Sequence, residues 1–440
     1  MLPGHAARLM RHGGQRNDHG VRTILLAQPC TTEPWPHPTL QNCGGNPTDP
    51  ETGIDRSAAM NKLDNTEMWV CPDQVFDGQR LLSGYAVRIQ SGRVIGIAPT
   101  AALDPHAKRL PLVGILSPGF VDLQVNGGGG RFLNAEPTTG CMIEIAAAHH
   151  KLGTTSILPT VITDAREVLD RAVDAAIEAA GEKGIAGLHI EGPHISIARR
   201  GTHAERHIRP LEKSTLSHAA RLRGAGVPLM LTIAPEACTD AQIAELTEMG
   251  VVVSLGHSDC DANRAETAIA SGARAATHLF NAMSPMENRA PGLTGTVINS
   301  EICAGIICDG VHVDDRMVGL AFRARPCADS MFLVSDAMPT VGGPDQFSLY
   351  GLDITREGNR LVNSEGSLAG AHTTMAIGVA RLVQKVGLDP ETALRAAIHV
   401  PSRLMGLDLD QLEGREVDDL LHLDHSCALV QPLGKVLLQA

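Results

Sequence analysis

Eight short apolar segments follow one another between residues 120 and 336, and most of the intervals between them carry the periodicity of a helix. Continuous apolar strands are typical of parallel sheets, because such strands are buried on both faces. Eight parallel strands close a (β/α)8 barrel. The segments cover residues 120–125, 154–159, 185–191, 228–236, 251–257, 274–279, 303–309 and 331–336. We therefore predict an α/β chain whose main domain, residues 117–405, is a TIM barrel.

The regions on either side of this barrel have a different pattern. Residues 68–116 alternate short apolar strands with turn signals, and residues 406–440 contain DDLLHLD and ALVQPLGKVLLQA, which we read as strands around a Pro-Leu-Gly turn. Both ends are therefore expected to form one small β-sandwich domain. Residues 1–67 contain six prolines between Pro29 and Pro50 and no sustained apolar periodicity, so we expect a disordered extension.

The overall charge and the cysteines exclude several classes of protein. The net charge is -12, from 37 Lys and Arg against 49 Asp and Glu, which argues against a nucleic-acid surface. Ten cysteines are scattered without a CxxC pair, as expected of a reduced cytoplasmic protein rather than a disulfide framework. No apolar stretch reaches the ~18 residues of a membrane span, so no membrane partner is expected.

Three of the apolar segments end on a residue that can bind a metal: Glu191, His257 and His278. The carboxyl ends of the strands of a barrel surround one axis, so these side chains can converge. One carboxylate and two imidazoles suit a divalent ion with an open coordination position, where water becomes a nucleophile near neutral pH. We predict one such ion per subunit. Zinc is the first expectation, while iron, manganese and cobalt also accept these ligands.

A fourth segment ends on Asp336, a carboxylate that could accept a proton from water and deliver it to a leaving amine. Alternatively, Asp336 only caps the segment that follows it. Gln124 and Asn126 lie two residues apart at the end of the first segment, so both side chains point to the same side. Amides are poor zinc ligands, which favours one metal with Gln124 and Asn126 hydrogen-bonding near it. They could instead simply cap the strand end.

With these residues identified, the sequence resembles the N-acetylglucosamine-6-phosphate deacetylases, a family of the amidohydrolase superfamily. The resemblance begins near Val75 and rests on segments in a fixed order: PGFVDLQVNG, LHIEGPHIS, GTHAERHIR, SLGHSD, ATHLFNAMSP, RAPGLTG, DGVHV, SDAMPT and GSLAGAH. It implies a metal bound by Glu191, His257 and His278, with Asp336 as proton acceptor and donor. These are the positions already selected from the residues alone.

The resemblance also implies the residues that contact substrate: Thr202, His203, Asn281, Ala282, Arg289, Asp309, His312, Leu368, Ala369 and Gly370. The planar guanidinium of Arg289 fits a phosphate group. His203 could donate a hydrogen bond to the acetyl oxygen as that oxygen gains charge, which is worth on the order of 10²-fold in rate. His312 would orient the sugar or the phosphate.

The reaction implied is hydrolysis of the acetamide of N-acetyl-D-glucosamine 6-phosphate to D-glucosamine 6-phosphate and acetate. The galactosamine epimer is the first alternative substrate, and another amidohydrolase reaction, such as cyclic-amide hydrolysis, is a second. A barrel without activity that serves as a binding protein is the third. The family also suggests a homodimer or a homotetramer.

Overall fold

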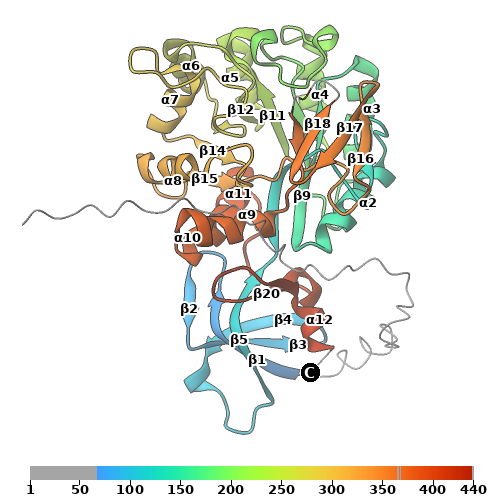
Figure 1. The fold of residues 1–440 in the computed structure, drawn as a ribbon. Helices are drawn as coiled ribbons and strands as arrows, with labels where there is room; N and C mark the ends of the chain where they lie inside the picture. Colours follow the sequence, from blue (N-terminus) through green and yellow to red (C-terminus); the bar gives the residue numbers. More distant parts are fainter. Residues whose placement is uncertain (1–66, 364–365, 367, 439–440) are drawn as a thin grey trace, which may run out of the picture. The chain divides into compact units, whose positions relative to one another are not determined.

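The computed structural model describes residues 67–363, 366 and 368–438 (Figure 1). Within this part of the chain, eight parallel strands form the central sheet, in the order β15-β14-β13-β12-β11-β10-β9-β6. The strands are β6 Phe120–Val125, β9 Thr154–Ile162, β10 Leu188–Glu191, β11 Leu229–Ile233, β12 Val252–Leu255, β13 Ala275–Ala276, β14 Cys303–Ile306 and β15 Met331–Leu333. The predicted (β/α)8 barrel is confirmed.

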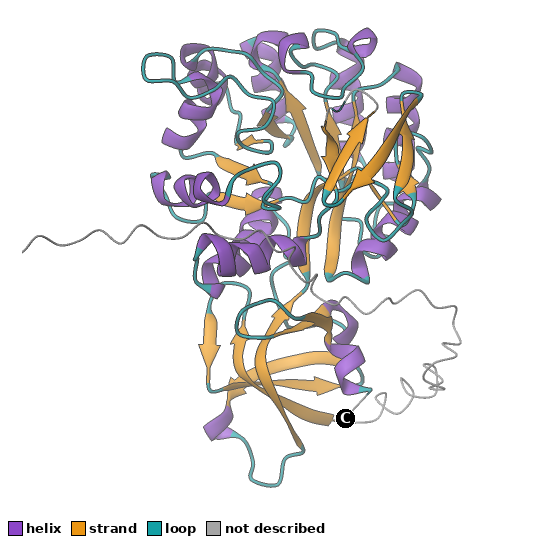
Figure 2. Cartoon of the chain, in the orientation of Figure 1, coloured by secondary structure: helices purple, strands orange, loops and turns teal. Residues whose placement is uncertain are grey.

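Helices follow most of the barrel strands and cover the outside of the sheet (Figure 2). They are α2 Thr139–His150, α3 Arg166–Glu178, α4 Lys213–Gly224, α5 Asp240–Glu248, α6 Ala262–Ala270, α7 Gly292–Asn299 and α8 Asp315–Ala324. The last unit is a longer helical run: α9 Met375–Arg381, η5 Leu382–Val386, α10 Pro390–Leu394, η6 Arg395–His399 and α11 Val400–Met405. None of the helices in the described residues is long and apolar enough to cross a membrane.

Burial explains why the strands read as continuous apolar runs. All six residues of β6 and all nine of β9 are buried, because one face packs inside the barrel and the other against helices. Thr239 forms a capping box with Gln242 at the start of α5, since each side chain bonds the other residue's backbone N–H. Such a cap ends the preceding loop at a defined residue.

The barrel closes where its first strand, β6, meets its last strand, β15, and few backbone hydrogen bonds connect the two. We call this contact the seam. The backbone N–H of Asp336 donates to the carbonyl of Gln124 at 3.0 Å. Beside it, the buried carboxylate of Asp122 accepts from the backbone N–H groups of Ser335 and Gln124, at 3.2 Å each. Burial raises the pKa of Asp122 to about 7. This seam fixes Asp336 opposite the side chains of β6.

The β domain draws strands from both ends of the chain, as predicted, and hydrogen bonds join all of them into one seven-stranded sheet. The order is β21-β20-β5-β1-β3-β4, and β2 pairs with β1. The strands are β1 Glu67–Phe76, β2 Leu81–Ser83, β3 Tyr85–Gln90, β4 Arg93–Pro99, β5 Arg109–Pro118, β20 Leu420–Leu423 and β21 Val430–Pro432. The final segment, predicted as a strand, is instead the short helix α12 Leu433–Leu437.

That last prediction was wrong because a short apolar run fits a strand and a buried helix turn equally well. The extension predicted for residues 1–67 lies, apart from Glu67, outside the described residues, and the domain boundaries remain predictions. Two smaller sheets complete the fold: β7 Gly127–Gly128 with β8 Arg131–Phe132, and a four-stranded sheet of β16 Gln346–Leu349, β17 Leu352–Glu357, β18 Arg360–Asn363 and β19 Leu368–Ala371.

Candidate active site

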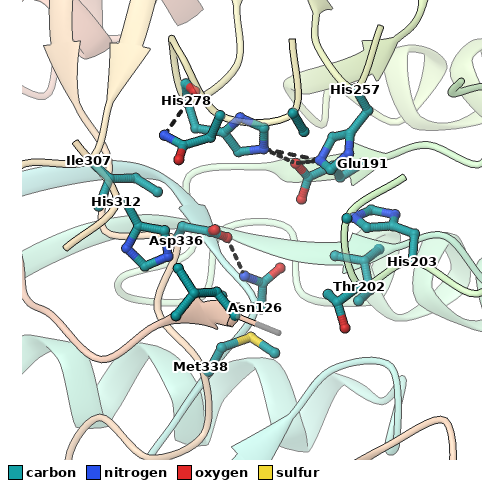
Figure 3. Close-up of a pocket in the computed structure, with 16 residues that line it drawn as sticks. Asn126, Glu191, Thr202, His203, His257, His278, Ile307, His312, Asp336 and Met338 are labelled. Carbon is teal, nitrogen blue, oxygen red and sulfur yellow. Dashed lines mark hydrogen bonds and ion pairs between the residues drawn. The ribbon is translucent and has the colours of Figure 1, made fainter. Parts of the chain in front are cut away.

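A cavity of about 210 Å³ lies where the barrel strands end (Figure 3). Twelve of the residues selected from the sequence line it: Asn126, Glu191, Thr202, His203, His257, His278, Asn281, Ala282, His312, Asp336, Leu368 and Gly370. The sequence reasoning missed four others, Ile162, Gly201, Ile307 and Met338. Ile162 and Ile307 lie at strand ends like the polar residues, but an apolar side chain there gives no signal that separates it from core.

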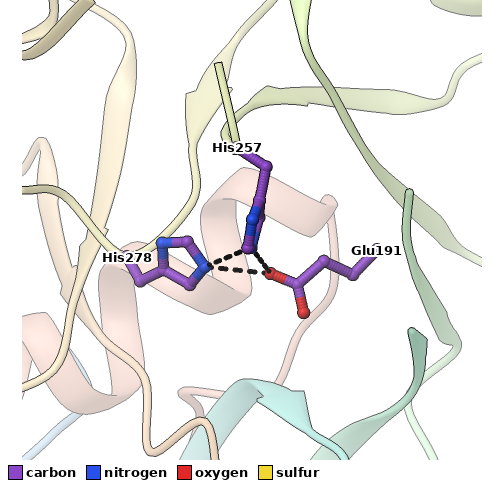
Figure 4. Close-up of side chains that lie close together, drawn as sticks. All are labelled: Glu191, His257 and His278. Atoms are coloured by element: carbon purple, nitrogen blue, oxygen red, sulfur yellow. Dashed lines mark hydrogen bonds and ion pairs between the residues drawn. The ribbon is translucent and has the colours of Figure 1, made fainter. Parts of the chain in front are cut away.

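Glu191, His257 and His278 converge on one point (Figure 4). Glu191 Oε1 lies 3.2 Å from His257 Nε2 and 3.0 Å from His278 Nε2, and the two Nε2 atoms are 3.0 Å apart. Glu191 is the last residue of β10, while both histidines sit just past their strands with positive φ, 48° for His257 and 29° for His278. This uncommon conformation turns each imidazole inward and is a type of strain that concentrates at functional sites.

The three side chains fit a divalent ion. Ligand atoms bound at about 2.0–2.1 Å in a tetrahedron lie about 3.3 Å apart, close to the spacing found here. All three residues are buried. The Nδ1 of His257 is 2.9 Å from the carbonyl oxygen of Arg199, to which it donates, so its Nε2 keeps a lone pair for a metal. Burial alone raises the pKa of Glu191, but the two imidazoles outweigh it and hold the pKa well below its ordinary value.

Asp336 lies beside these ligands and receives two amide donors on one oxygen. Asn126 Nδ2 donates to Asp336 Oδ1 at 2.7 Å, and Gln124 Nε2 donates to the same atom at 3.2 Å and to Glu191 Oε1 at 3.0 Å. Burial, and then the charge of Glu191, raise the pKa of Asp336 to about 6. Asp336 also has a positive φ, of 52°. A buried carboxyl with this pKa, and with one oxygen left free of these amide donors, is suited to exchanging a proton near neutral pH.

His203 lies against His257 and is 3% exposed. Its ring centroid is 4.4 Å from that of His257, and its Nδ1 is 2.7 Å from the hydroxyl of Thr163. Burial, followed by the neighbouring His257, lowers the pKa of His203 to about 3, so the ring is neutral. A neutral imidazole here can offer one donor to the pocket.

His312 is held in place by Asp309. The carboxylate of Asp309 is 2.6 Å from His312 Nδ1 and accepts the backbone N–H groups of Val311 and His312. Burial lowers the pKa of His312, but Asp309 overcomes this effect and the net shift is upward. This shift favours the protonated ring, and His312 lines the pocket. Asp309 acts behind it rather than on the cavity surface.

Three further sequence-selected residues do not line the cavity. Gln124 is buried just behind it and acts through Glu191 and Asp336. Ala369 is buried between Leu368 and Gly370, whose strand β19 forms one wall. Arg289 lies on the exposed loop 285–291 and is not among the pocket residues. Its role as a phosphate ligand stays a prediction.

Comparisons with known proteins agree on one family. The profile of the amidohydrolase family matches residues 115–415. The N-acetylgalactosamine-6-phosphate deacetylase of a Shewanella strain is 35% identical over 86% of this chain and 98% of its own length, and the human N-acetylglucosamine-6-phosphate deacetylase is 36% identical over 67% and 75%. The crystal structure of N-acetylglucosamine-6-phosphate deacetylase from Pasteurella multocida superposes with a TM-score of 0.76 at 30% identity, covering 84% of this chain and 98% of that one.

Proposed function

Because this chain belongs to the amidohydrolase family, we propose that it hydrolyses the acetamide of N-acetyl-D-glucosamine 6-phosphate to D-glucosamine 6-phosphate and acetate. The observation that carries the proposal is the meeting of Glu191, His257 and His278 with Asp336 in one cavity. Relatives that bear this activity in their names cover most of the chain.

The metal site is proposed to hold one divalent ion on Glu191, His257 and His278. Such an ion, when bound, lowers the pKa of water and polarises the amide carbonyl. A second ion would need further ligands at the end of β6. The side chains there, Gln124 and Asn126, instead donate hydrogen bonds to the carboxylates of Glu191 and Asp336. We propose zinc, while iron, manganese and cobalt suit the same donor set.

The remaining steps belong to the chain's own side chains. Asp336 accepts the proton of the attacking water on Oδ2, because Oδ1 already accepts two amide donors. His203 donates to the acetyl oxygen as negative charge develops there. Asp336 then returns the proton to the departing nitrogen, which leaves as a free amine.

The sugar phosphate is proposed to lie between Thr202, His312 and the wall formed by Leu368 and Gly370, with Asn281 and Ala282 toward the phosphate. Neither lysine nor arginine is among the described residues that line the cavity. Arg289 is therefore proposed to complete the phosphate site either by movement of its loop or from a second copy of the chain. The second possibility requires an oligomer, and a homodimer or homotetramer would bring Arg289 of another copy to the cavity.

N-acetyl-D-galactosamine 6-phosphate is the second candidate substrate. It is favoured by the Shewanella relative, which matches over 98% of its length and carries that name. The two substrates differ at one hydroxyl group, and both use the same chemistry at the acetamide. We place the reaction in the cytoplasm, since every cysteine in the described part of the chain is a free thiol.

Acetate release measured side by side on the two sugar phosphates, with metal analysis of the same preparation, tests the proposal. We expect a higher kcat/KM on the glucosamine epimer and about one metal ion per chain. A higher value on the galactosamine epimer transfers the assignment to the second candidate. No acetate from either substrate after addition of zinc, manganese or cobalt would leave a binding protein as the explanation.

A further inference from the structure

Thr163 lies immediately after β9, behind the pocket, and has no role in the reaction as described so far. Its side chain is fully buried, and its Oγ1 is 2.7 Å from His203 Nδ1. The carbonyl oxygen of Glu191 lies 3.4 Å from the same hydroxyl, close to the limit of a hydrogen bond. The hydroxyl is therefore shared unequally between two neighbours, and the imidazole is the closer one.

The residues around this hydroxyl leave room for it. A Cβ on Gly192 would lie 2.2 Å from Thr163 Oγ1, so only a glycine at that position leaves room, and its φ of 81° also suits glycine. On the other side, the Tyr350 hydroxyl donates to the carbonyl oxygen of Thr163. Tyr350 connects β16 with β17, so the four-stranded sheet anchors this strand end. The hydroxyl is thus held by His203 and Glu191, in the space beside Gly192, on a backbone that Tyr350 anchors.

A hydroxyl carries one hydrogen, and a neutral imidazole has one donor and one acceptor nitrogen. The hydroxyl can donate its hydrogen to Nδ1 of His203 at 2.7 Å, or it can accept from a protonated Nδ1 and donate to the carbonyl oxygen of Glu191 at 3.4 Å. The second arrangement places its hydrogen in a contact at the limit of hydrogen bonding, so the first, with Nδ1 as the acceptor, makes the stronger use of it. The proton of the ring then resides on Nε2, because the hydrogen bond at one nitrogen sets which tautomer is present. Among the described residues, Nε2 of His203 has no hydrogen-bond partner, and the residue lines the cavity.

We propose that Thr163 is a positioning residue that donates to His203 Nδ1 and so holds the His203 ring with its Nε2–H directed at the substrate's acetyl oxygen. The proposal rests on the proposed function, because His203 needs this tautomer to donate to that oxygen. In the opposite tautomer Nε2 would present a lone pair and repel the developing negative charge.

The kinetic test compares Thr163→Val, Thr163→Ser and Thr154→Val in the metal-loaded enzyme. Thr154 is the matched control: it is a buried threonine at the start of β9, the strand that Thr163 follows, and its hydroxyl has no partner in the described residues. We expect Thr163→Val to lower kcat by about tenfold or more. The upper limit is the ~10²-fold loss expected when an oxyanion donor is removed altogether. KM should change by less than about threefold. Thr163→Ser should restore most of kcat, and Thr154→Val should match the parent enzyme.

A double-mutant cycle shows whether Thr163 acts through His203. In a His203→Ala background, Thr163→Val should cause no further loss of kcat. An equal loss in both backgrounds, or a Thr163→Val enzyme indistinguishable from Thr154→Val, would overturn the proposal.

Nitrogen-15 NMR of histidine-labelled protein separates this proposal from the proposed function, because it requires no turnover. The His203 signals, identified by their loss in His203→Ala, should show a protonated Nε2 and an unprotonated Nδ1. A protonated Nδ1 refutes the role of Thr163 even in an active enzyme. If the tautomer is as expected but no acetate is released from either sugar phosphate, the proposed function fails and the placement of the hydrogen stands.

Discussion

Replacing Asp336 by asparagine removes the proposed proton acceptor while keeping the shape of the side chain. The amide oxygen of the Asp336→Asn side chain can occupy the place of Oδ1 and keep the hydrogen bonds from Asn126 and Gln124, because those groups are both donors. Its NH2 group then stands where Oδ2 was, and it has no basicity. Since the packing is preserved, the change isolates proton transfer, and we expect kcat to fall by about 10² to 10⁴. That corresponds to roughly 2.7–5.4 kcal/mol in the barrier.

The assay is the initial rate of acetate release over a range of substrate concentrations, with metal content measured on the same samples. The metal should be retained, because Glu191, His257 and His278 are unchanged. Asp353→Asn, at an exposed aspartate of β17, controls for the substitution itself and should behave like the parent. A variant at position 336 whose kcat stays within about threefold of the parent, with normal metal content, refutes the assignment of Asp336 as proton carrier.

Three further outcomes are expected. The carboxylate of Asp336 must be ionised to accept a proton, so kcat/KM should fall as the pH drops. The pKa of Asp336 is raised to about 6 without the charge of an ion, and a bound divalent cation lowers it, so the midpoint of the fall should lie below 6. Asn126→Ala, which removes a donor that lowers this pKa, should move the fall to higher pH; a profile that does not move in that variant contradicts the argument. Removing the metal with a chelator should abolish activity and lower the melting temperature, both restored by a divalent ion, because the ion binds only the folded site; an unchanged melting temperature would count against binding at these ligands. Asp122→Ala leaves two buried N–H groups unpaired at the seam, and each unpaired group costs about 1–3 kcal/mol. Urea unfolding should therefore show that the free energy of unfolding falls by at least about 2 kcal/mol. A smaller loss would mean that water replaces the carboxylate.

The sequence was sufficient for the barrel and for the convergence of Glu191, His257 and His278 because both depend on local patterns. Each apolar run marks a buried strand, and Glu191, His257 and His278 lie at or just after the ends of such runs. Asp336 and Asn126 were found by the same rule. The convergence of these side chains then follows from the geometry of a closed parallel sheet.

The parts that could not be predicted depend on contacts between distant segments. Thr163 is one of many threonines next to a strand, and only the approach of His203 from a loop forty residues later gives it a role. Met338 lines the cavity because Gly370 brings β19 against it, which no local pattern encodes. The placement of Arg289 outside the pocket likewise depends on how its loop folds.

The pairing of β5 with β20 has a consequence for how the protein is made. Leu116 pairs with His422, which a ribosome adds about 300 residues, or some 15–60 s, later at typical rates. Until then β5 presents an open edge, and open edges invite pairing with other chains. The barrel can form meanwhile, whereas the β domain must wait for the last part of the chain. Truncation before β20 is therefore expected to produce aggregation rather than a shorter active enzyme.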